Sequence, residues 1–142
     1  MSKRHTPVAI RREIVQRSHG RCAYCQLQEK YSGHLLTLEH IIPESLGGLT
    51  VAENLCMACW SCNQAKGDRT TGVDSDTGEA VRLFHPNQQE WGEHFQWSKD
   101  GLHVIGKTPT GRATIATLKL NQAHRVLSRG FWVKGGWHPP LP

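Results

Sequence analysis

The sequence lacks any apolar run close to the roughly 20 residues that a membrane-spanning helix requires. Its first residues, Met1 to Thr6, are basic and polar and contain neither the apolar stretch nor the cleavage site of a signal peptide. Internal repeats and low-complexity tracts are also absent. These absences argue against membrane and exported proteins, so we expect a soluble, cytoplasmic protein with no membrane partner.

Acidic residues are fewer than basic ones, with 12 against 17, which leaves a net charge of +5 and a pI of about 9.1. The basic residues recur along the whole chain, and distributed positive charge suits a polyanion better than a small substrate. At 142 residues the chain fits one domain and has no room for a second enzyme domain.

Four of the five cysteines form two C-x-x-C pairs, Cys22 with Cys25 and Cys59 with Cys62. Each pair can aim two sulfur atoms at one ion, and together they supply the thiolate set of a structural Zn²⁺ site. A disulfide framework would need an oxidising compartment, and a redox C-x-x-C would accompany a βαβ pattern that this sequence lacks. We therefore predict zinc, with the remaining Cys56 as a small core residue.

The first 48 residues predict one helix, one strand and one turn. Thr6 and Pro7 have the form of an N-cap and a first helical residue, and Gly20 ends that helix. Apolar alternation over residues 36–40 predicts a strand that leads into Glu39 and His40. Glycines 47 and 48 predict a turn after it.

A capping box of the form Thr50-x-x-Glu53 predicts a short helical turn over residues 54–57. The second cysteine pair should start a helix that Gly67 closes, and residues 70–79 should form a loop.

The last third predicts a strand at 80–84, a hairpin over 95–106, a helix at 110–118 and a helix from Asn121, as its N-cap, to about residue 129. The fold class is therefore α+β.

The stretch CAYC…LEHIIPESLGGLTVAENLCMACWSCNQAKGD resembles the HNH endonuclease superfamily over residues 20–69. The resemblance implies a β-β-α finger that holds one divalent metal, here Mg²⁺ or Mn²⁺, and is stabilised by a four-cysteine zinc site. It further implies hydrolysis of DNA, for which a hard cation and an imidazole base are suitable parts.

The resemblance also implies residue roles. His40 matches the general base, and imidazole suits that task because it is mostly neutral at pH 7. Glu39 and Asn63 match the two ligands of the catalytic metal. Asn54 matches the residue that braces the loop around the base. Arg21, Lys66 and Arg69 are candidate contacts to nucleic acid.

The C-terminal third looks like an extension found on some bacterial HNH proteins. Its aromatic residues could stack on bases, but their strand-like and turn-flanking positions favour core packing; they include Phe84, Trp91, Phe95 and Trp97. Three histidines of this part of the chain, His85, His94 and His103, lack the spacing of a metal site.

We thus expect a single domain over residues 1–142, with an HNH core at 20–69 and a hairpin and helix extension at 79–142 packed on it. The expected function is metal-dependent cleavage of DNA by a monomer or homodimer, with double-stranded DNA as the expected substrate. The alternatives are a non-catalytic zinc-ribbon module that binds nucleic acid and, third, an interaction module whose basic surface docks a protein.

Overall fold

A computed structural model describes residues 6–141 of the chain. These residues fall into two compact units. Unit 1 extends to Thr70 and includes His85–Gln88, whereas unit 2 comprises Thr71–Phe84 and the chain from Gln89 onward. The predicted bounds of the HNH core stay a prediction. Packing of the 79–142 extension on that core stays a prediction.

Unit 1 begins with α1 (Val8–Ser18), which buries Ile14 and packs against β2. Pro7 is the N-cap rather than the first helical residue, so the helix starts one residue later than predicted. His19 ends it in the left-handed conformation, and Gly20 follows with φ 72°. The short α2 (Glu29–Ser32) follows the first cysteine pair.

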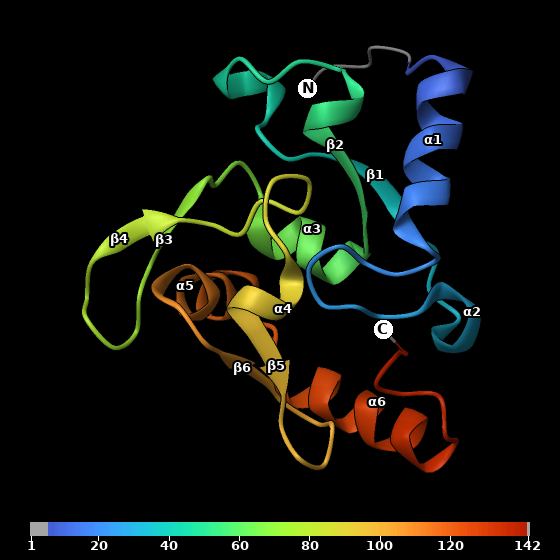
Figure 1. Ribbon diagram of the computed structural model, residues 1–142, viewed down its shortest axis with the longest axis vertical. Helices are drawn as coiled ribbons and strands as arrows, with labels where there is room; N and C mark the ends of the chain where they lie inside the picture. Colours follow the sequence, from blue (N-terminus) through green and yellow to red (C-terminus); the bar gives the residue numbers. More distant parts are fainter. Residues whose placement is uncertain (1–5, 142) are drawn as a thin grey trace. The chain divides into compact units, whose positions relative to one another are not determined.

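An antiparallel hairpin and a helix form the centre of unit 1 (Figure 1). Strand β1 (Thr37–His40) pairs with β2 (Leu55–Ala58), and α3 (Trp60–Lys66) follows β2 after Cys59. The connection between the strands carries two single turns, η1 (Glu44–Leu46) and η2 (Ala52–Asn54). This is the β-β-α order that the resemblance implied.

The predicted helical turn over residues 54–57 is wrong, because most of this segment is β2. All four residues of β2 are buried, so its backbone groups need the ladder with β1. The predicted capping box is also wrong, because Val51 is the N-cap of η2 and no side chain caps this turn. Thr50 instead contacts His40.

Residues 85–88 belong to unit 1 because Asn87 ties them to the end of the β1–β2 connection. Its side-chain amide donates to the carbonyl oxygens of Glu53 at 3.0 Å and Leu55 at 2.9 Å.

Unit 2 contains two hairpins and two long helices. Strand β3 (Thr71–Val73) pairs with β4 (Ala80–Arg82), and β5 (Phe95–Trp97), preceded by α4 (Trp91–His94), pairs with β6 (Val104–Gly106). Helix α5 (Pro109–Leu118) packs against β3, β4 and β6, and α6 (Ala123–Lys134) follows it. The α+β class is therefore confirmed for both units.

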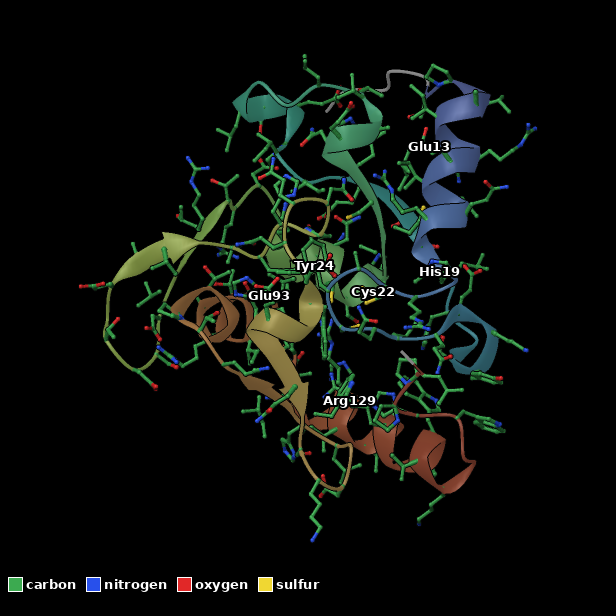
Figure 2. All side chains as sticks on the ribbon, viewed as in Figure 1. Glu13, His19, Cys22, Tyr24, Glu93 and Arg129 are labelled. Carbon is green, nitrogen blue, oxygen red and sulfur yellow. The ribbon has the colours of Figure 1, made fainter. Side chains whose placement is uncertain are left out.

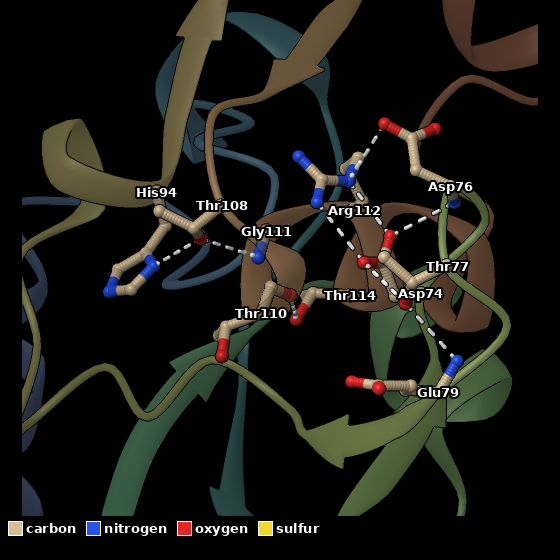
Figure 3. A network of polar contacts seen from close by, with 10 residues as sticks. All are labelled: Asp74, Asp76, Thr77, Glu79, His94, Thr108, Thr110, Gly111, Arg112 and Thr114. Carbon is tan, nitrogen blue, oxygen red and sulfur yellow. Dashed lines mark hydrogen bonds and ion pairs between the residues drawn. The ribbon is translucent and has the colours of Figure 1, made fainter.

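Two expectations for unit 2 are corrected. The segment 70–79, predicted as a loop, contributes β3, because Thr71–Val73 pair with β4. The buried carboxylate of Asp74, directly after β3, accepts a two-point hydrogen bond from Arg112 of α5 and anchors the turn (Figure 3). Asn121 is not the N-cap of α6, which is Gln122. The Asn121 side chain instead bridges the backbone N–H and C=O of Val104.

Four aromatic residues of unit 2 pack on one another, namely Phe84, Trp91, Phe95 and Trp97. Phe84 and Phe95 are buried, with ring centroids 5.2 Å apart, and Trp91 lies 5.1 Å from Phe95. This arrangement agrees with a core role rather than with stacking on bases. Within residues 6–141, no helix has the length and apolar character of a membrane span.

Candidate functional site

The two cysteine pairs of unit 1 come together in one buried cluster. Their four sulfur atoms lie within 4.8 Å of one another, and those of Cys25 and Cys59 are 3.7 Å apart. A tetrahedral site with Zn–S bonds of about 2.3 Å would separate its sulfur atoms by about 3.8 Å. Figure 2 labels Cys22 within this part of the unit. The predicted meeting of the four cysteines is confirmed, and the cluster suits a structural zinc.

Local backbone structure aims each pair of thiols. In the first pair, the N–H of Gln26 returns to the carbonyl of Cys22 at 3.0 Å, and Gln26 takes a positive φ of 65° that tightens the turn. In the second pair, Cys59 caps α3 and its sulfur accepts from the N–H of Cys62 at 3.4 Å. Burial raises the pKa of the Cys22 and Cys62 thiols, so a cation is needed to hold all four groups as thiolates.

Glu39 lies on the buried face of β1, where it is paired with a buried lysine. Its Oε1 atom is 3.6 Å from Nζ of Lys66, and its Oε2 atom accepts from Sγ of Cys56 at 3.5 Å. The Lys66 ammonium also donates to the carbonyl of Ile41 at 2.8 Å. Burial raises the pKa of Glu39, while the Lys66 charge and the Tyr24 hydroxyl oppose that shift.

His40 follows Glu39 on β1 and points to the opposite face of the strand, since successive side chains alternate. It is half-buried, and its Nε2 atom lies 2.9 Å from Oγ1 of Thr50. One ring nitrogen of the candidate base thus has a defined partner.

Asn54 braces the loop that carries Thr50. Its amide nitrogen donates to the carbonyls of Ile42 at 3.0 Å and Leu49 at 2.9 Å, and its Oδ1 accepts from the N–H of Ile42 at 2.8 Å. Gly48 closes the same loop, where a Cβ would collide with the carbonyl oxygen of Ile42. All the side-chain groups of Asn54 are thus used on backbone, so its hydrogen bonds serve the loop.

Asn63 lies on α3, one turn before Lys66. Its amide nitrogen donates to Oγ1 of Thr37, the first residue of β1, at 3.5 Å. Thr37 and Glu39 are two residues apart on β1, and Asn63 and Lys66 are three apart on α3, so each pair shares one face of its element. The Glu39 and Asn63 side chains therefore both belong to the interface between β1 and α3.

Glu39 and Asn63 carry oxygen atoms of the kind that divalent cations prefer. Oε1 of Glu39 is buried and has no hydrogen-bond partner within residues 6–141, which makes it a hard oxygen with unused acceptor capacity. Asn63 adds an amide oxygen. Within the same residues, the four cysteines are the one group of three or more His, Cys, Asp or Glu side chains that could hold a metal.

The three basic candidates for nucleic-acid contact lie in different environments. Arg69 is exposed and its guanidinium donates to the carbonyl of Ala65 at 2.9 Å, while Arg21 is half-buried beside the first cysteine pair. Lys66 is only 1% exposed. This burial does not suit a phosphate contact, because the Lys66 ammonium already faces Glu39 and donates to the Ile41 carbonyl. We therefore omit Lys66 from the proposed DNA-binding residues.

Thr50 and Tyr24 contact the candidate site residues but had no functional signal in the sequence. Thr50 fits a helix cap by its spacing to Glu53, and Tyr24 stands inside a cysteine pair. The loop that Asn54 holds brings Thr50 to His40, and the contact of the Ala23 N–H with the Met57 carbonyl of β2 brings Tyr24 close to Glu39, so long-range contacts were needed to find both residues.

Comparison with protein families gives a match to the HNH endonuclease family over residues 22–69. A comparison with curated proteins gives no match. The matched residues contain the whole four-cysteine cluster, the β1–β2 hairpin and α3. Residues 22–69 are therefore similar to the HNH endonuclease family.

Proposed function

We propose that this protein is a metal-dependent endonuclease that hydrolyses phosphodiester bonds of double-stranded DNA, with His40 as the general base. The observation that carries the proposal is the position of His40 within the HNH-matching segment, half-buried and held at Nε2 by Thr50 beside a loop that Asn54 braces. A protein that only binds nucleic acid needs neither the base nor this support.

In the proposed reaction, His40 accepts a proton from the water that attacks the phosphorus atom. Asn54 keeps the loop around His40 in place. Glu39 and Asn63 would hold Mg²⁺ or Mn²⁺ through their oxygen atoms. When bound, such a cation supplies neutralisation of the charge that develops on the phosphate and on the leaving oxygen.

A structural zinc and basic phosphate contacts complete the proposed nuclease. The four cysteines would bind one structural Zn²⁺, which suits the reducing cytoplasm where thiols stay available. Arg21 and Arg69 are proposed phosphate contacts, in keeping with the net charge of +5.

The ion pair between Lys66 and Glu39 favours a second candidate function. An ammonium 3.6 Å from the carboxylate already balances its charge, as a bound cation would. If Lys66 keeps divalent cations out, this part of the chain is a non-catalytic zinc-ribbon module that binds nucleic acid.

A plasmid-nicking assay separates the two candidates. Wild-type protein is incubated with supercoiled plasmid with EDTA, Mg²⁺ or Mn²⁺, next to His40→Ala and the matched control His34→Ala, an exposed histidine of the same unit. We expect nicking that depends on metal and is lost only in His40→Ala, with DNA binding retained.

Two other results would change the assignment. Full activity of His40→Ala would place the base elsewhere. Binding of DNA by the wild type with no cleavage in any metal would support the zinc-ribbon module, and preference for a protein over all forms of DNA would support a docking role.

A further inference from the structure

The contact between His40 and Thr50 restricts which nitrogen of His40 can act as a base. A neutral imidazole carries one N–H and one free lone pair, so each ring nitrogen has a different role. Nε2 lies 2.9 Å from the Thr50 hydroxyl, which can either accept from Nε2–H or donate to the Nε2 lone pair.

Only one of these arrangements leaves a free base. If the hydroxyl donated to Nε2, the ring proton would sit on Nδ1, and neither nitrogen would have a lone pair for water. If Nε2–H donates to the hydroxyl, the Nδ1 lone pair stays free. The same Nε2–H bond persists after Nδ1 takes up a proton, because both nitrogens of the imidazolium are donors.

The fold anchors the backbone next to Thr50 before substrate arrives. Leu49, the residue before Thr50, has its carbonyl bonded to Asn54 at 2.9 Å, and the N–H of Gly48 returns to the carbonyl of Pro43 at 2.9 Å. At the other end of the contact, the β1–β2 ladder pairs His40 with Leu55. Both partners are therefore anchored by separate backbone contacts.

From these contacts we infer that Thr50 is a positioning residue that holds His40 in the Nε2–H tautomer and leaves Nδ1 as the nitrogen that accepts the proton of water. The inference rests on the proposed function and deepens it. It also gives Asn54 a consequence for catalysis, since Asn54 fixes the backbone next to Thr50.

The tautomer is read by nitrogen-15 NMR of the imidazole rings in the full, zinc-loaded chain, with the His40 signals assigned by their loss in His40→Ala. We expect wild type to show the Nε2–H pattern at a pH where His40 is neutral. Thr50→Val, which replaces the hydroxyl by a methyl group of similar size, should give a mixture of both tautomers. Thr50→Ser should restore the wild-type pattern.

The kinetics of plasmid nicking provide a second, independent test. Thr50→Val should lower kcat for plasmid nicking about tenfold at nearly unchanged KM, as expected for the loss of one orienting hydrogen bond. Thr50→Ser should recover most of that loss. Thr71→Val, an exposed threonine of β3 in unit 2, is the matched control and should behave as wild type.

An Nδ1–H pattern in the wild type, or a Thr50→Val variant with unchanged tautomer and unchanged kcat, would overturn the inference. A wild type that cuts no DNA would instead defeat the proposed function. The NMR comparison would still decide whether Thr50 sets the tautomer, so the two failures are distinct. If Thr50→Val did not fold, the wild-type and Thr50→Ser spectra would decide.

Discussion

Lys66 is a buried cation, and both of its partners belong to one segment of unit 1. Its ammonium donates to the Ile41 carbonyl and faces Glu39, and both side chains of the ion pair are at most 5% exposed. Taking two charges out of water is costly, but removing only one of them leaves the other uncompensated. The pair thus links α3 to the strand that carries the proposed site.

Lys66→Met should lower the free energy of unfolding of unit 1, measured without Mg²⁺ or Mn²⁺, by about 3–5 kcal/mol, because it leaves the Glu39 carboxylate buried without a cation. Urea unfolding followed by circular dichroism, with zinc present, measures this change. The double variant Lys66→Met/Glu39→Gln should recover part of the loss. Equal destabilisation in the single and double variants would show that packing of the lysine stem, rather than charge, is responsible.

His138 is a buried histidine of unit 2 whose protonation should weaken the fold. Its Nε2 donates to the Gly101 carbonyl at 3.0 Å. Its ring packs edge-on against the Trp97 ring, with the ring centroids 4.4 Å apart. Burial, with the positive charge of Arg129, lowers its pKa to about 4. Because an unfolded histidine has a pKa of about 6.5, the unfolded state binds more protons between pH 6.5 and pH 4.

The contribution of neutral His138 should therefore be complete above about pH 6.5 and be lost as pH falls toward 4. The loss should be on the order of 1–2 kcal/mol, less than the whole pKa difference corresponds to, because the fold relaxes and admits water around a charged ring. Urea unfolding at several pH values, compared with His138→Gln, isolates this slope. The same pH slope in both proteins would assign it to other groups.

At the scale of elements, the four-cysteine cluster joins segments that make few regular backbone contacts. The first pair stands between α1 and α2, and the second joins β2 to α3. Strands β1 and β2 have four residues each, and a two-stranded hairpin of this length is only marginally stable alone. A metal in the cluster would stabilise the hairpin and the helix together.

Cys59→Ser should unfold unit 1, since structural zinc contributes on the order of 10 kcal/mol or more to folding in small metal-bound domains. Cys56→Ser is the matched control: it changes a buried cysteine of β2 outside the cluster, so its effect should be mild. Elemental analysis and circular dichroism test both variants. Wild type prepared without chelators that contains no zinc would defeat this prediction.

For the whole molecule, the net charge of +5 should make DNA affinity strongly dependent on salt. Arg69→Gln should weaken binding and reduce the slope of log affinity against log salt by about one, as the loss of one phosphate contact does. Lys99→Gln, an exposed change in the β5–β6 turn, is the control outside the HNH segment. Filter binding over a range of salt concentrations measures the slope, and affinity that does not vary with salt would contradict phosphate-based binding.

A single general base can serve one phosphodiester at a time, so a monomer should nick supercoiled plasmid before it produces linear DNA. A time course on agarose gels, repeated over a range of protein concentrations, checks this order. Linear product without a nicked intermediate would indicate that two copies act together on the duplex.

The spacing of the four cysteines, the HNH-like order and the α+β class were determined by the sequence alone. A spacing of two residues lets one local turn direct both thiols of a pair at the same ion, so these features do not depend on distant contacts. Residues 95–106 formed the expected hairpin for a similar reason, because a Gly-bearing turn favours pairing of its own flanks.

Only the tertiary structure decided the surroundings of the proposed catalytic residues. Residues 55–58 became a strand because β1 lies beside them, and that pairing outweighed their local preference. Lys66 was buried because Glu39 faces it from β1, and Thr50 met His40 because the loop folds back through Asn54. Most of these contacts join residues 10 or more positions apart, and short-range patterns carry no information about such pairs.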